Sequence, residues 1–243
     1  MRSIFEDEVV DPAQPLWRYF RLDRIVESLR TQVLYFPSAR QFEDPFEGAT
    51  AVQPHDWPVD PRFDPLKDHG ETAFEELRRL TKISSWHRAD YESDAMWKLY
   101  AAERKGVAIR TTAERLRTSL RPYRVQPQYG EEEPYWGNVR YVDLFQTRLP
   151  VSMEQRFFYK HRAFEWEREF RIIISLRMAE EFVLHVPELG INVPFDPAVL
   201  VESIFVGPSL AEPERVILKE ACTLAGLAHE FRTSTLLGRP RYT

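Results

Sequence analysis

The chain has 243 residues and a net charge of −5, with 43% hydrophobic and 29% charged residues. This composition excludes a disordered chain, and the apolar runs are too short for a membrane-spanning helix. The acidic balance argues against general nucleic-acid binding, and the single cysteine, Cys222, together with a start that lacks a secretion signal, predicts a cytoplasmic protein.

Strands and helices are interleaved in the first half of the sequence. Residues 1–15 contain two prolines and read as an irregular N-terminal arm. Hydrophobic spacing then predicts strands at 16–20, 33–36, 82–86 and 107–109, helices near 23–29, 71–80, 96–100 and 111–120, and a proline-rich loop at 37–65.

Strands dominate the second half. The pattern predicts strands at 123–129, 138–142, 170–174, 182–186, 202–206 and 229–232, and helices at 152–164 and 212–225. The segment 182–186 alternates like a hairpin partner of 170–174. The sequence therefore predicts one mixed α+β domain over residues 16–243, without a regular βαβ winding.

The densest group of charged residues lies at 160–171. If its second half begins the strand that continues to Ile174, Glu165, Glu167 and Glu169 share one face of that strand. Arg168 and Arg171 then lie on the opposite face. Crowded carboxylates raise at least one pKa, which is typical of a catalytic site. The alternative is a solvated edge on which Lys160, Arg162 and Arg171 pair with the acids.

Two further clusters have both a structural and a functional interpretation. Asp44 precedes a proline, so it either forms an Asx-turn or orients a substrate hydroxyl. Trp97 and Tyr100 are three residues apart on a helix, where they either pack in the core or form a wall for a ring-shaped ligand. We expect no metal site, because His161 and Glu165 have no third ligand at a recognisable spacing.

These clusters, in this order, resemble the bacterial family known as domain of unknown function 2971. The resemblance runs from residue 16 to about 232. The matching residues are Trp17-Arg18-Tyr19, Asp44-Pro45-Phe46-Glu47, Ser84-Ser85, Met96-Trp97, Tyr100, Gly106-Val107, Lys160, Trp166, Glu167, Glu169, Arg171, Ile204 and Gly207. The sequence departs from the family pattern at Glu43, His87 and Phe164. The family name assigns no activity.

The order of the motifs also resembles the ADP-ribosyltransferase superfamily, whose members bind NAD in a cleft between two small sheets. The resemblance implies two small, mainly antiparallel sheets with flanking helices, and a catalytic glutamate at Glu167 or Glu169. It implies that NAD is held by a set of residues from the earlier motifs: Arg18, Tyr19, Ser84, Ser85, Trp97 and Tyr100. Asp44, Lys160 and Arg171 then support the substrate or the site.

Three functions remain open from the sequence. The first is an NAD-dependent ADP-ribosyltransferase-like enzyme, of the toxin or phage-defence type, that acts on an unknown macromolecule. The second is a non-catalytic binding or regulatory module, in which the glutamates and arginines form a structural ion-pair network. The third is a metal-dependent nuclease that uses Asp44, Lys160, Glu167 and Glu169. No membrane partner is expected, and the sequence predicts no oligomeric state.

Overall fold

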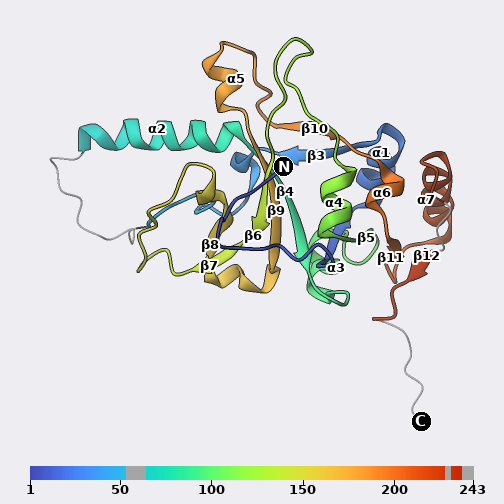
Figure 1. The fold of residues 1–243 in the computed structure, drawn as a ribbon. Helices are drawn as coiled ribbons and strands as arrows, with labels where there is room; N and C mark the ends of the chain where they lie inside the picture. The colour runs from blue at the N-terminus through green and yellow to red at the C-terminus, as the bar shows by residue number, and fades with distance from the viewer. Residues whose placement is uncertain (53–63, 228–230, 237–243) are drawn as a thin grey trace. The chain divides into compact units, whose positions relative to one another are not determined.

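The computed structural model describes residues 1–52, 64–227 and 231–236, and its fold is mixed α+β, as the sequence predicted (Figure 1). The chain divides into two compact units, each assembled from segments that are far apart in the sequence. Unit 1 comprises Met1–Val9, Tyr35–Ser85 and Pro122–Asn192, and unit 2 comprises Val10–Leu34, Trp86–Arg121 and Val193–Thr243. Among the described residues no helix is both long and apolar enough to cross a bilayer.

One sheet of eight strands corrects the expectation of two small sheets. Its hydrogen-bonded order is β1 (Arg2–Ser3), β6 (Tyr135–Asn138), β9 (Glu169–Ser175), β4 (Thr81–Arg88), β2 (Pro15–Phe20), β5 (Val107–Thr112), β11 (Ser203–Val206) and β12 (Phe231–Thr233). The pairings β6–β9, β4–β2, β2–β5 and β5–β11 are antiparallel, whereas β1–β6 and β11–β12 are parallel. Two pairs of short strands stand apart from this sheet: β10 (Gly190–Pro194) with β3 (Val33–Pro37), and β7 (Arg140–Val142) with β8 (Tyr159–His161).

Unit 1 surrounds its strands with short helical turns and one long helix. These elements are η1 (Ala39–Gln41), α2 (Asp64–Leu80), η3 (Gln155–Phe158), η4 (Arg162–Glu167) and α5 (Arg177–Glu181). An apolar core cluster contains Phe5 from the N-terminal segment, Ile83 of β4, Phe157 and Phe158 of η3, and Ile173 of β9. Both phenylalanines of η3 are fully buried, so this turn is anchored beside β9.

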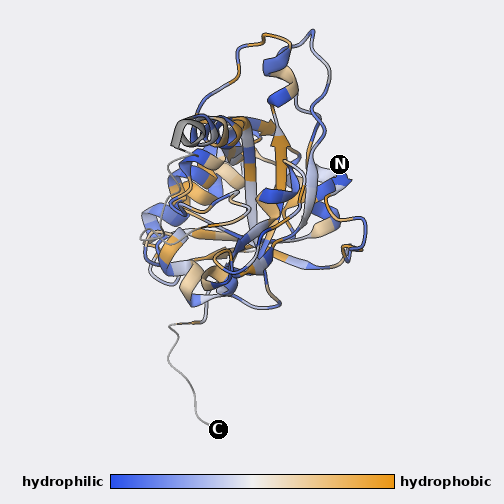
Figure 2. Cartoon of the chain, turned by 90° about the vertical axis from the view of Figure 1, so that its left-hand side faces the viewer, coloured by the Kyte–Doolittle hydropathy of each residue, from blue (hydrophilic) through white to orange (hydrophobic). Residues whose placement is uncertain are grey.

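The described residues of unit 2 include five helices: α1 (Leu22–Thr31), α3 (Asp94–Tyr100), α4 (Ala113–Ser119), α6 (Pro197–Leu200) and α7 (Glu212–Leu224). Helix α1 buries Ile25, Val26 and Leu29 on one face, which packs against α7. Helix α4 begins where Thr112 accepts a hydrogen bond from the Arg115 amide, one residue later than the sequence predicted. In Figure 2 one central strand is largely orange, that is hydrophobic, whereas the helices carry both blue and orange segments.

Three expected elements are wrong. Residues 152–164 form η3, β8 and the start of η4 instead of one helix. Residues 123–129 are not a strand but make an isolated bridge from Tyr123 to Glu132, since the prolines at 122 and 127 interrupt any ladder. Residues 182–186 do not pair with β9, whose neighbours are β6 and β4, and Val183 has a positive φ of 61°.

The N-terminal arm, residues 1–15, is partly regular structure. The arm contributes β1 and the first residue of β2, so it is more regular than expected. Part of the loop expected at 37–65 and the beginning of the strand expected at 229–232 lie outside the described residues.

Candidate active site

The chain bends between two of the predicted catalytic residues. The side chain of His161 caps η4 by accepting a hydrogen bond from the Ala163 amide. The turn ends at Arg168, which has a left-handed φ of 43°, and β9 begins at the next residue. This bend brings Glu167 and Glu169 to the same cation, whereas Glu165 stays exposed. The expectation that three glutamates share one strand face is therefore wrong.

Lys160 of β8 joins these two glutamates. Its Nζ lies 2.5 Å from Glu167 Oε2 and 2.9 Å from Glu169 Oε1. The side chain of Phe164 covers the ammonium at 4.6 Å from the ring centre. All three charged side chains are less than a tenth exposed, so water screens these ion pairs weakly.

Arg171 extends the network inside unit 1. Its Nε and Nη2 donate to Glu169 at 2.8 and 3.0 Å, and its Nη1 and Nη2 donate to Glu47 at 2.5 and 3.0 Å. A second bond from Nη1 reaches the Phe157 carbonyl at 2.6 Å. Every N–H of the guanidinium thus has an acceptor, which is what a fully buried arginine requires. Arg171 lies with Glu169, so the expectation that it occupies the opposite face is corrected.

The network shifts the pKa values of its glutamates in different directions. Burial, together with the neighbouring Glu169, raises the pKa of Glu167 to about 7, against the opposing effect of Lys160. Burial disfavours the charged form of Glu169 as well, but Arg171 and Lys160 hold its pKa well below the usual value. Burial raises the pKa of Glu47, and Arg171 opposes that shift. Glu167 is therefore the carboxyl that exchanges a proton near neutral pH.

The residues predicted to support the site in unit 1 have mixed positions. Asp44 is buried and accepts the Phe46 amide at 2.9 Å, so it forms the Asx-turn that the sequence left open. Its Oδ2 is buried and has no hydrogen-bond partner. Ser84 and Ser85 are consecutive residues of β4, and the Ser85 hydroxyl is also buried without a partner.

The predicted NAD-binding residues of the first strand belong to unit 2. The Arg18 guanidinium lies over the rings of Phe20 and Trp86, 5.1 and 5.6 Å from their centres, and burial lowers its pKa to about 10. The Tyr19 hydroxyl accepts the Ser93 amide at 2.9 Å. Tyr19 is buried, and Arg18 is partly exposed.

The two aromatic residues of α3 have different environments. Trp97 is fully buried in a cluster with Trp17 and Tyr19, and its Nε1 donates to Glu92 at 2.9 Å. Tyr100 is 45% exposed. The core interpretation therefore describes Trp97, whereas Tyr100 is partly exposed to solvent.

Glu47 is the member of the network that the sequence interpretation missed as a functional residue. It lies 124 residues from Arg171 along the chain, so no local spacing connects them. Its place in the Asp-Pro-Phe-Glu segment was the only available signal. Within the described part of the chain, no group of three or more His, Cys, Asp or Glu residues is arranged to hold a metal ion.

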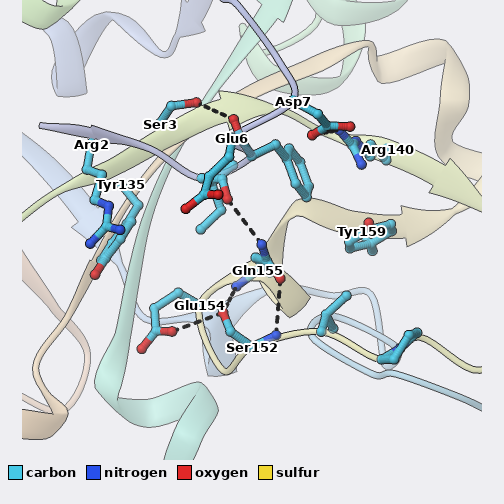
Figure 3. A pocket seen from close by; sticks show the side chains of 14 residues that line it. Arg2, Ser3, Glu6, Asp7, Tyr135, Arg140, Ser152, Glu154, Gln155 and Tyr159 are labelled. Carbon is cyan, nitrogen blue, oxygen red and sulfur yellow. Dashed lines mark hydrogen bonds and ion pairs between the residues drawn. The ribbon is translucent and has the colours of Figure 1, made fainter.

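A cavity of about 500 Å³ lies elsewhere in unit 1, between the N-terminal segment and the loop before η3 (Figure 3). Its polar lining is largely bonded to itself: Arg140 pairs with Asp7, and Gln155 bonds both Ser152 and the Ile4 carbonyl. Its lining includes none of the five charged residues of the network. We place the candidate active site at the network, because a buried carboxyl with a shifted pKa and a specific charged partner is typical of catalytic sites.

No family model matches the chain, so the resemblance to domain of unknown function 2971 stays a prediction. No curated protein sequence matches it either.

Three solved structures resemble the chain, and all are of DarT from Thermus sp. 2.9. The complex with NAD+ has 8% sequence identity and a TM-score of 0.37, and the match covers 93% of this chain and 96% of that one. The complex with ADP-ribosylated single-stranded DNA has 8% identity, a TM-score of 0.35 and coverages of 93% and 95%. The complex with carba-NAD+ has 11% identity, a TM-score of 0.33 and coverages of 92% and 95%. A likeness of this degree assigns neither a ligand nor a residue role to this chain.

Proposed function

We propose that the chain is an ADP-ribosyltransferase-like enzyme that uses NAD+ as its substrate and Glu167 as its catalytic carboxyl. The observation that carries the proposal is the state of Glu167. This carboxyl is almost buried, is held by Lys160 at 2.5 Å, and has a pKa of about 7. Strongly shifted groups with a specific charged partner are typical of catalytic sites.

The proposed reaction breaks one bond and forms another. The glycosidic bond between the ribose C1′ and the nicotinamide nitrogen breaks, and its electron pair leaves with neutral nicotinamide. A nucleophilic atom of the acceptor bonds to C1′, and its proton passes to the ionised Glu167. The same carboxylate accepts a hydrogen bond from the ribose 2′-hydroxyl and stabilises the positive charge that develops on the ribose.

The other two glutamates are poorer candidates for this role. Both oxygens of Glu169 are engaged by Arg171 and Lys160, and its low pKa keeps it ionised without proton exchange. Glu165 is exposed and is outside the network. Glu169, Lys160 and Arg171 therefore position Glu167 in this proposal.

The contacts to NAD are proposed from the sequence. Arg18 supplies a positive charge for a phosphate of NAD, and Ser84 or Ser85 supplies a hydroxyl for the ribose. Tyr100, which is 45% exposed, is a better stacking partner for nicotinamide than the buried Trp97. Tyr19 is proposed to support Arg18, its neighbour on β2.

The second candidate is a non-catalytic binding module. The observation that favours it is the internal pairing of Arg171, whose donors are all used by Glu47, Glu169 and the Phe157 carbonyl. A purely structural ion-pair network has the same appearance. The two candidates differ in whether Glu167 is needed for a reaction or only for folding.

An assay of nicotinamide release from NAD+, with a bacterial lysate as acceptor source, separates the two candidates. We expect Glu167→Gln to lower the rate at least about 100-fold while keeping the fold, because it removes the carboxylate from the reacting centre. Glu165→Gln is the matched control, since it makes the same change two residues away at an exposed site, and it should keep the wild-type rate. Absence of turnover by the wild-type chain, or equal rates for wild type and Glu167→Gln, would reject the enzyme in favour of the binding module.

A further inference from the structure

The charges of the network balance without Glu167. Lys160 and Arg171 supply two positive charges, and Glu47 and Glu169 supply two negative charges. A fifth charge, on Glu167, leaves the buried group with one excess negative charge. In a poorly solvated site this excess is costly, so the state of Glu167 depends on the charge of every other member.

Glu47 is the member at the far end of this chain of ion pairs. Its side chain is fully buried, and both of its oxygens face N–H donors of Arg171. These two charge-assisted bonds favour the ionised form of Glu47, against the burial that raises its pKa.

Glu47 also determines where Arg171 lies. The paired bonds to Glu47 fix the plane of the guanidinium, and the same plane presents Nε and Nη2 to Glu169. Glu169 in turn shares Lys160 with Glu167. The backbone helps this arrangement, because Gly48 has a φ of +80° and a side chain there would lie 2.5 Å from the Phe157 ring.

We propose that Glu47 is a positioning residue for Glu167. Glu47 holds Arg171 in place and supplies a negative charge that raises the proton affinity of the Glu167 carboxyl. This inference rests on the proposed function for its biological meaning, but its physical content does not require NAD. Lys160 on β8, Glu169 on β9 and Tyr141 on β7 interact with Glu167 directly. Arg171 on β9 and Glu47 in the loop after η1 are connected to it through Glu169. The Tyr141 hydroxyl accepts the Glu169 amide, and burial raises its pKa, so it stays neutral while Glu167 titrates.

The test is a titration of the Glu167 carboxyl by carbon-13 NMR in the full chain, without NAD. In the wild type the midpoint should lie at about 7. In Glu47→Gln one negative charge is lost, so the network balances with Glu167 ionised, and the midpoint should fall by about one pH unit or more. Glu47→Asp is the matched control, because it keeps the charge, and its midpoint should stay close to that of the wild type.

A folded Glu47→Gln variant whose Glu167 midpoint equals the wild-type value would overturn the inference. If Glu47→Gln does not fold, the wild-type spectrum still decides, because the inference needs an ionised Glu47 while Glu167 titrates. A Glu47 carboxyl that stays protonated throughout the Glu167 transition contradicts the inference. The titration does not depend on turnover. An absence of NAD turnover with the expected titration would reject the proposed function alone. If the chain is active, the midpoint of its pH–rate profile should move with the NMR midpoint in Glu47→Gln.

Discussion

At the scale of single residues, the central feature is Glu167, whose ionised carboxylate gives the buried network one more negative than positive charge. Lys160 and Arg171 are neutralised by Glu169 and Glu47, and Glu167 shares Lys160 with Glu169. Crowding of glutamates in the sequence predicted a raised pKa in this segment, and the structure assigns that shift to Glu167, with burial as its largest cause. The cost of this arrangement is electrostatic, and it depends on pH.

The pH dependence of stability provides a prediction for Glu167. Its pKa in the folded chain is about 7, above the ordinary value of 4.5, so the folded state holds a proton that the unfolded state releases between these values. The wild type should therefore lose stability as the pH rises from 4.5 to 7, by up to about 3 kcal/mol from this group. Glu167→Gln has no such proton, so its free energy of unfolding relative to wild type should improve over the same range. Urea unfolding of both proteins at about pH 5 and pH 8 measures this, and a difference that does not change with pH would contradict the assignment.

At the scale of elements, the decisive feature is the bend between η4 and β9. Arg168 adopts a left-handed conformation there, which is uncommon for a residue with a side chain. The bend places the last residue of η4 and the first residue of β9 on the same lysine. In a regular strand the side chains of Glu167 and Glu169 would leave the same face, separated by about two residue rises along the strand.

Substitutions at Arg168 test this role of the bend. Arg168→Gly should be tolerated within about 1 kcal/mol, since glycine adopts a positive φ without a steric penalty. Arg168→Val should cost about 1–2 kcal/mol more, because a β-branched side chain clashes in the left-handed region. Urea unfolding compares the two variants, which lose the same exposed arginine and differ in backbone freedom. Equal stabilities would show that the left-handed bend is not required.

The sequence predicted the elements that have a clear local signal. Helix α7 has an apolar stripe with a proline in its first turn, and β9 has the run Ile172–Ile174, so both were located correctly. The helix predicted at 152–164 was wrong. Phe157 and Phe158 are both buried in a short 3-10 turn, and this pattern resembles part of a helix. The partnership of Glu47 with Arg171 bridges 124 residues and follows from the tertiary fold, which no local pattern encodes.

At the scale of the whole molecule, the chain builds two units from interleaved segments, and the charged network lies wholly within unit 1. Its members come from the loop after η1, from β8, and from the η4–β9 bend. The predicted contacts of Arg18 and Tyr100 with NAD involve residues of unit 2, and they remain predictions. The proposed function therefore depends on whether the intact chain turns over NAD+ through Glu167.

The most direct measurement is the rate of nicotinamide release from NAD+ by the intact chain as a function of pH. The account predicts a rate that rises with pH through a midpoint of about 7, since the reaction needs Glu167 in its ionised form. A rate that does not change between about pH 5.5 and 8.5, or no NAD turnover at any pH, would contradict it.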